Sequence, residues 1–209
     1  MPVFLFLIFV CLISCFFSCE QLPLKLLLPA FFAVLLVVES VCYYYQISNK
    51  NNTLIYNLWF PVEFSFYSFW VACYLSNRYF KQSIVLCIFI YLSICGLMYI
   101  QKSDLYKFNT LAFQLGVVLL IPVLLYKLYE FINESVIINP FRNALFWLIS
   151  GLLISSLGSF FQFSVENYLL ENHKDVLFAL RQFNVLLTDV LYCCIIAYFI
   201  LSWRMRLHH

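Results

Sequence analysis

The sequence predicts an all-α, polytopic transmembrane bundle of about seven spans. Of the 209 residues, 65% are hydrophobic and only 11% are charged, whereas soluble domains carry about 25% charged residues. The apolar residues form runs that approach or reach the roughly 20 residues needed to cross a bilayer. Every connection between these runs is short, and there is no second, polar block. We therefore expect residues 1–209 to form a single transmembrane domain, with the lipid bilayer as its main partner.

The first apolar run is rather short for a span. No lysine or arginine precedes it, and Phe16 and Phe17 stand where a cleavage site would need small residues. We expect an uncleaved helix here and keep a cleaved signal peptide as the alternative. The predicted spans cover residues 3–18, 25–46, 54–76, 83–100, 110–132, 143–169 and 176–203.

The second and third spans each carry a carboxylate. Glu39 lies in the second span, which ends in a belt of tyrosines at 43–45, and Glu63 lies in the third, two residues after Pro61. A carboxylate at membrane depth costs about 2.5–3.5 kcal/mol on insertion scales, so it needs a partner or a task. The proline leaves one carbonyl free, which neighbouring groups must satisfy.

The last three spans supply the remaining polar residues. The fifth contains Gln114 and Pro122. The sixth follows an Asn139–Pro140 turn and carries small residues at Gly151, Ser155, Gly158 and Ser159, a spacing that lets two helices approach closely. The seventh contains Arg181, Asn184 and Asp189.

The basic residues divide unequally between the two ends of the bundle. One end has Lys50, Lys102, Lys107 and Lys174, and the other has Lys25, Arg78, Lys81, Lys127, Arg142, Arg204 and Arg206. The positive-inside rule predicts that the more basic end faces the cytoplasm. We therefore expect a multi-pass protein of the bacterial inner membrane, with its N-terminus outside and its C-terminus in the cytoplasm.

In this orientation the intramembrane polar residues share a level. At 1.5 Å per residue, Glu39 lies roughly 10 Å and Glu63 about 13 Å below the outer end, and most inner halves are apolar. We expect a polar, ligand-binding cavity open to the outside. The alternative is that these residues only form buried hydrogen bonds and ion pairs that fix the register of the helices. The expected ligand-binding residues are Glu39, Glu63, Gln114, Gln162, Arg181, Asn184 and Asp189.

Arg181 needs a carboxylate partner at this depth. Glu39, Glu63 and Glu166 are the candidates, and we expect Glu166 to lie at the membrane interface rather than to bind a ligand. The sharper hypothesis is that Glu39, Glu63 and Arg181 meet in one site in the outer half.

The sequence contains none of the common catalytic motifs. It has no HExxH, GxSxG or glycine-rich phosphate loop, and its three histidines lie outside the predicted spans. The nine cysteines form no CxxC pair, and the small net charge of +2 is scattered. We therefore expect no metal, no cofactor, no nucleic-acid partner and no catalytic residue. The alternative is acid–base hydrolysis of a lipid headgroup by Glu39, Glu63 and Asp189.

Three segments carry a resemblance. They are Trp59-Phe-Pro-Val-Glu-Phe-Ser-Phe-Tyr67, Asn139-Pro-Phe-Arg-Asn-Ala-Leu-Phe-Trp147 followed by Gly151, and the last span with Asn184. From about residue 40 onward the chain resembles small, uncharacterised seven-helix membrane proteins of Bacteroidota-type bacteria, which are similar to the membrane input regions of sensor histidine kinases. The resemblance implies a seven-helix fold and a link to signalling, and it implies no catalytic residue.

The leading functional hypothesis is a sensory or regulatory module. It would bind a small ligand in the outer half and act through a signalling protein on the cytoplasmic side. The alternatives are a small-solute or proton-coupled transporter or channel, a structural subunit of a membrane complex, and a lipid-modifying enzyme.

Overall fold

The computed structural model describes residues 2–17, 24–101, 107–133 and 140–207, and within these ranges it is helical with no strand. The all-α prediction is confirmed. Residue 18 of the first predicted span, Lys102, and Asn139 of the predicted turn lie outside the described residues. The helices are α1 (Val3–Phe17), α2 (Leu24–Ile47), α3 (Thr53–Ala72), α4 (Arg78–Gln101), α5 (Thr110–Asn133), α6 (Ala144–Asn172) and α7 (Lys174–Leu207), with a 3-10 turn, η1, at Pro140–Arg142.

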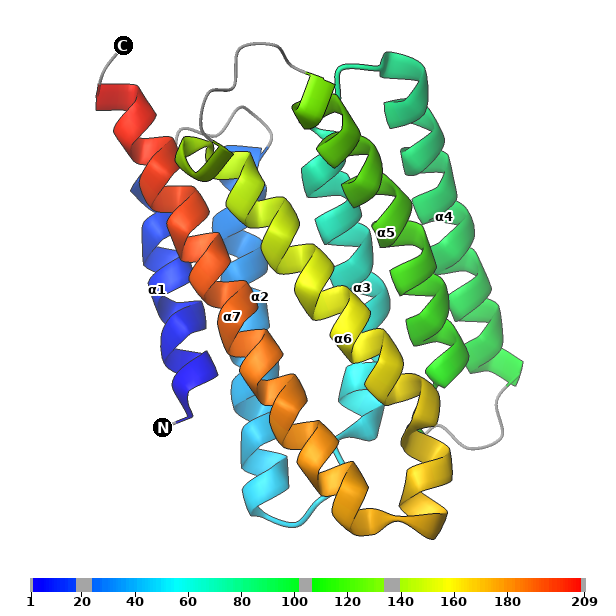
Figure 1. Ribbon diagram of the computed structural model, residues 1–209. Coiled ribbons are helices and arrows are strands. Elements are labelled where there is room, and N and C mark those ends of the chain that lie inside the picture. Colours follow the sequence, from blue (N-terminus) through cyan, green and yellow to red (C-terminus); the bar gives the residue numbers. More distant parts are fainter. Residues whose placement is uncertain (1, 18–23, 102–106, 134–139, 208–209) are drawn as a thin grey trace.

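The helices run alternately up and down (Figure 1). Six of them form a closed ring of contacts: α7 packs on α1, α1 on α2, α2 on α3, α3 on α5, α5 on α6, and α6 on α7. The contact between α6 and α7 is the most extensive, and that between α2 and α3 is slight. Helix α4 lies outside this ring against α3 and α5. The C-terminal end of the chain is at the top of Figure 1 and the 48–52 loop is at the bottom.

Five helices are long and apolar enough to cross a membrane: α2, α4, α5, and most of α6 and α7. Helix α1 is apolar but has only 15 residues, and α3 is not among the five. Large apolar side chains are exposed on the outer faces of the helices, for example Phe89 and Ile100 on α4. Lipid is the solvent that suits such a surface, because apolar side chains gain nothing from water.

The upper half of the bundle is filled by aromatic side chains. Trp70 is fully buried, with its ring centroid 5.4 Å from Tyr198 and 5.9 Å from Phe199. The hydroxyls of Tyr74 and Tyr198 are 2.7 Å apart, which links the end of α3 to α7. This half of the bundle is therefore closed by close-packed rings, which contribute large buried areas.

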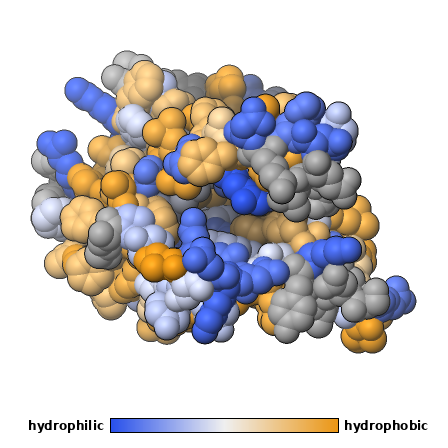
Figure 2. All heavy atoms as spheres, turned by 90° about the horizontal axis from the view of Figure 1, so that it is seen from below, coloured by the Kyte–Doolittle hydropathy of each residue, from blue (hydrophilic) through white to orange (hydrophobic). Residues whose placement is uncertain are grey.

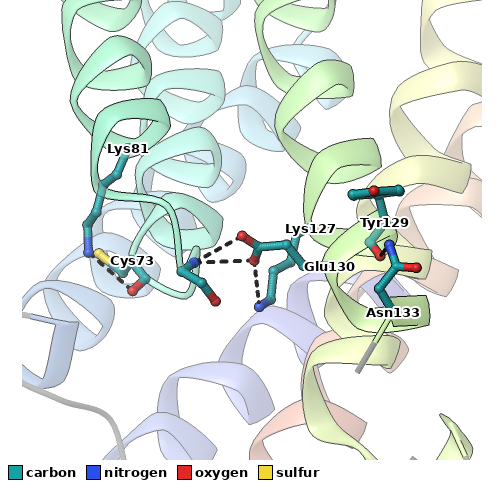
Figure 3. Close-up of polar contacts among 7 residues, drawn as sticks. Cys73, Lys81, Lys127, Tyr129, Glu130 and Asn133 are labelled. Atoms are coloured by element: carbon teal, nitrogen blue, oxygen red, sulfur yellow. Dashed lines mark hydrogen bonds and ion pairs between the residues drawn. The ribbon is translucent and has the colours of Figure 1, made fainter. Parts of the chain in front are cut away.

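A buried ion pair holds the turn between α3 and α4 (Figure 3). Lys127 Nζ donates to Glu130 Oε2 at 3.1 Å, and the same carboxylate accepts the Ser76 amide, at 3.1 Å to Oε1. The Lys81 ammonium donates to the Cys73 carbonyl at 3.2 Å. These contacts tie α5 to the turn that α3 and α4 share.

This turn begins and ends earlier than the sequence suggests. Helix α3 ends at Ala72 rather than 76, and α4 begins at Arg78 rather than 83. The reason is a helix cap: the Asn77 side chain accepts the amides of Tyr79 and Phe80 at 3.0 and 3.2 Å. Such a cap satisfies amides that the first helical turn otherwise leaves unpaired.

Pro61 sits within α3 without breaking it. A proline at 61 has no N–H to donate to the carbonyl of Asn57, four residues earlier. The Tyr99 hydroxyl of α4 donates to that carbonyl instead. The expected compensation by a neighbouring helix is thus provided, and it fixes this part of α3 against α4.

Candidate functional site

A cavity of about 480 Å³ opens at the lower end of the bundle. Figure 2 shows the hollow from below, near the centre of this face and bordered by hydrophilic side chains. It is lined by side chains from α1, α2, α3, α5, α6 and α7 and from the 48–52 loop. Toward the upper end its lining stops at Tyr67, Leu152 and Tyr192, below the packed rings of Trp70, Tyr198 and Phe199.

The cavity gathers five of the seven predicted ligand-binding residues: Glu39, Glu63, Gln162, Arg181 and Asn184. They come from four different helices, so the common depth inferred from the sequence corresponds to proximity in space. The prediction that they bind a ligand remains a prediction.

The other two, Gln114 and Asp189, do not line the cavity. Gln114 donates to the Ser164 hydroxyl of α6 at 3.0 Å and acts as an interhelical pin. Asp189 is half-buried on α7, and its Oδ1 has no hydrogen-bond partner among the described residues. Its neighbours Thr188, Leu191 and Tyr192 face the cavity, whereas Asp189 itself is turned away from it.

Helices α2 and α3 form the acidic wall. Glu39 Oε2 accepts the Tyr56 hydroxyl at 3.2 Å. Glu63 lies close enough to Glu39 for their charges to interact, and it neighbours Tyr67 and Trp59. Neither carboxylate forms an ion pair with a basic side chain in the part of the chain that the structure describes.

Helices α6 and α7 form the opposite wall, which holds the only cation–carboxylate pair of the cavity among the described residues. Arg181 Nη2 lies 2.6 Å from Glu166 Oε1, and the Glu166 side chain is largely buried. The hypothesis that Arg181 pairs with Glu39 or Glu63 is wrong: of the three candidate partners, Glu166 forms the ion pair. The reason is the hairpin geometry, which brings α6 and α7 side by side. Glu166 ends the part of α6 that is apolar enough to span a membrane, and its side chain lines the cavity.

Two buried acceptors on α6 have no partner among the described groups. Gln162 is only 4% exposed, and its Oε1 accepts no hydrogen bond. The second oxygen of Glu166, Oε2, is also buried and unpaired. Leaving a buried polar group unsatisfied costs about 1–3 kcal/mol. Such groups in a cavity wall are what a bound polar molecule would satisfy.

The small residues of α6 serve two purposes. At Gly151 a Cβ atom would lie 2.6 Å from the Cβ of Cys194, and at Gly158 it would collide with Leu187, so both glycines allow α7 to approach closely. Ser155 and Ser159 instead line the cavity. The Ser159 hydroxyl donates to Asn184 Oδ1 at 2.7 Å and holds that side chain in place.

Aromatic rings complete the cavity between α3, α5 and α6. The ring centroid of Phe60 lies 5.1 Å from Phe113 and 5.8 Å from Phe163, and Phe108 stacks on Phe163 at 4.7 Å. Asn57 fixes the segment that bears Phe108, because its side chain donates to the Lys107 carbonyl at 2.9 Å and accepts the Asn109 amide at 2.8 Å.

No group of three or more His, Cys, Asp or Glu side chains is placed to hold a metal ion among the described residues. The cavity instead offers carboxylate and amide oxygens on two walls and aromatic faces on a third. No protein-family model, curated protein or solved structure matches the chain.

Proposed function

We propose that the protein is a sensory or regulatory membrane module that binds a small ligand in the cavity. The observation that carries this proposal is the closed-ended polar cavity, where the buried oxygens Gln162 Oε1 and Glu166 Oε2 have no hydrogen-bond partner among the described residues. Its volume of about 480 Å³ lies within the range of roughly 300–1,000 Å³ that is usual for small-molecule pockets.

Binding in the cavity has a physical route to the other end of the bundle. Helices α3 and α7 both line the cavity, and both continue upward to the hydroxyl contact between Tyr74 and Tyr198. A ligand that changes the distance between α3 and α7 would therefore alter the packing at the upper end. A ligand can shift the equilibrium between two arrangements of α3 and α7 only by as much as its affinities for those arrangements differ.

The orientation we propose places the cavity outside the cell. The described basic residues at the cavity end are Lys50, Lys107 and Arg181, whereas Lys25, Arg78, Lys81, Lys127, Arg142 and Arg204 lie toward the other end. The side chains of Lys102, Lys174 and Arg206 lie outside the described residues. The positive-inside rule favours a cytoplasmic upper end in a bacterial inner membrane. The resemblance to input regions of sensor histidine kinases favours a signalling protein as the partner there.

A transporter is the second candidate, because Glu39 and Glu63 line the cavity without an ion-pair partner among the described residues, as carriers of protons in pumps often do. The aromatic packing above the cavity speaks against an open path in this conformation. The Tyr99 hydrogen bond across Pro61 also restrains the helix at the point where a hinge would be expected.

One experiment separates these functions. Purified protein in nanodiscs is screened by melting temperature against amines, amino acids, sugars and carboxylates, beside a Ser155→Trp variant that fills the cavity. A compound that stabilises only the wild type is then tested by hydrogen exchange and in proteoliposomes. The proposal expects altered exchange at residues 73–81 and 196–204 without uptake. Uptake would favour transport. The proposal is overturned if no compound in the screen binds, or if every stabilising compound acts equally on the filled variant.

A further inference from the structure

The acidic wall carries information about the class of ligand. Three carboxylates line the cavity, from Glu39, Glu63 and Glu166, against two basic side chains, from Lys50 and Arg181. Arg181 already forms an ion pair with Glu166, at 2.6 Å. Lys50 lies in the loop at the mouth, with its ammonium 5.9 Å from the ring of Tyr45. Negative charge on the α2–α3 wall therefore has no compensating cation among the described side chains.

Two carboxylates that lie close together on one wall of a cavity repel one another. Burying such charges is expensive unless an opposite charge accompanies them. Glu39 and Glu63 are close enough to interact, and both are near Tyr192 as well. Either a shared proton or an external cation would relieve the repulsion.

The other groups of the cavity favour an organic cation. The unpaired buried oxygens, Gln162 Oε1 and Glu166 Oε2, are acceptors, so they call for a ligand that donates hydrogen bonds. The rings of Phe60, Phe113 and Phe163 form an apolar wall, and aromatic faces attract cations within about 6 Å. The cavity volume of about 480 Å³ is also much larger than a single inorganic ion requires.

We infer that the cavity binds a small organic cation, with its ammonium group against Glu39 and Glu63 and its apolar part against the phenylalanine wall. This inference rests on the proposed ligand-binding function and adds the chemical class of the ligand. The ammonium belongs either to a free amine or to an aminated lipid headgroup, which share this chemistry.

The test uses three probes of one shape. Tryptamine carries an ammonium, tryptophol replaces it with a hydroxyl, and indole-3-propanoate replaces it with a carboxylate. Each is titrated against the full chain in nanodiscs of phosphatidylglycerol, which has no amine, and the melting temperature is recorded. We expect tryptamine to raise the melting temperature and the other two to have little effect.

The variants are chosen to keep the shape of the side chains. Glu63→Gln and Glu39→Gln should each lower the affinity for tryptamine about thirtyfold or more, since a buried charge pair loses one member. Their melting temperatures without ligand should equal or exceed that of the wild type, because the repulsion is gone, and this value also reports that they fold. Asp189→Asn, which removes a carboxylate of α7 outside the cavity, should leave tryptamine binding unchanged.

The outcomes are distinct. If tryptophol stabilises the protein as well as tryptamine does, or if the two glutamine variants bind tryptamine normally, the cation site is wrong while the ligand pocket stands. If tryptamine has no effect, the inference is overturned. If none of the three probes changes the melting temperature, and the compound screen of the wild type and the Ser155→Trp variant also finds no ligand, the proposed ligand pocket is wrong as well. Adding phosphatidylethanolamine to the nanodiscs distinguishes the source: competition with tryptamine identifies a headgroup site, and its absence a site for a free amine.

Discussion

The Arg181 guanidinium and the Glu166 carboxylate lie 2.6 Å apart across the hairpin that joins α6 to α7. Helix α6 ends at Asn172 and α7 begins at Lys174, so the two residues stand at nearly equal distances from the turn. The pair closes one wall of the cavity near its mouth. Its arginine side chain is 53% exposed, whereas the glutamate side chain is 12% exposed.

A double-mutant cycle should detect this pair. Arg181→Met leaves a largely buried carboxylate without its cation and should lower the free energy of unfolding by about 1–2 kcal/mol, less than for a fully buried pair because the arginine is half exposed. Adding Glu166→Gln should restore part of the loss, measured by chemical or thermal unfolding in detergent. The matched control is Glu63→Gln, whose effect should simply add to that of Arg181→Met. Coupling at 63 but not at 166 would contradict the observed pairing.

The glycines of α6 provide a second prediction. Gly151→Ala should destabilise the protein by about 1–3 kcal/mol, because the new Cβ would lie 2.6 Å from Cys194 Cβ and force α6 and α7 apart. The Gly158 position is a weaker test, since the tip of Leu187 can rotate away.

Gly96 on α4 is the control for this substitution. A Cβ there meets nothing within 4 Å, so Gly96→Ala should stabilise the helix by up to about 1 kcal/mol. Melting temperatures in the same detergent would compare the two variants. Equal shifts in the same direction would mean that α6 and α7 are not in close contact.

The helices were predictable because their evidence is local. Long apolar runs with polar ends predict them directly, and the depth of Glu39 and Glu63 follows from counting residues along two adjacent helices. The turn between the third and fourth spans is predicted a few residues too late, because Cys73, Tyr74 and Leu75 are apolar and extend the third run beyond the end of α3 at Ala72.

The details of the cavity depend on rotation of each helix, which counting cannot supply. Gln114 and Asp189 have the right depth and face elsewhere. Glu166 and Arg181 stand at nearly equal distances from the turn between α6 and α7, so counting residues back from that turn could have identified the pair. Tyr56 has no distinguishing pattern, because tyrosines occur throughout this chain. Ser159 is part of the small-residue pattern of the sixth span, which predicts helix packing and not its hydrogen bond to Asn184.

The hydrogen bond across Pro61 gives a third prediction. Tyr99→Phe removes a donor from the Asn57 carbonyl and should cost about 1 kcal/mol or more. In a Pro61→Ala background the restored amide of residue 61 can donate to that carbonyl, so the same substitution should cost less. Unfolding of the four variants in detergent measures the difference. An equal cost in both backgrounds would show that Tyr99 stabilises α3 in another way.

The ion pair between Lys127 and Glu130 at the upper end of the bundle gives a fourth prediction. Lys127 is only 4% exposed, so Lys127→Met should destabilise the protein by about 3 kcal/mol by leaving Glu130 uncompensated. Glu130→Gln keeps an oxygen for the Ser76 amide and removes the charge. The double variant should therefore be more stable than Lys127→Met alone, as measured by its melting temperature. Failure of this rescue would assign the loss to packing around the lysine stem.

The last prediction concerns orientation. The turns and chain end at the upper side carry most of the described basic residues, and positive charge is retained on the cytoplasmic side during insertion. Alkaline phosphatase inserted at Asn49, in the exposed loop beside the cavity mouth, should be active, because that enzyme matures only outside the cytoplasm. A green fluorescent protein fused after Arg206 should fluoresce, because its common form matures only inside. The reciprocal fusions, green fluorescent protein at Asn49 and alkaline phosphatase after Arg206, should both be inactive. If both reporters place their sites on one side, an even number of crossings separates Asn49 from Arg206 and the seven-span topology is wrong. If both reciprocal fusions are the active ones, the bundle is inverted and the cavity opens to the cytoplasm, so its ligand would be an intracellular molecule.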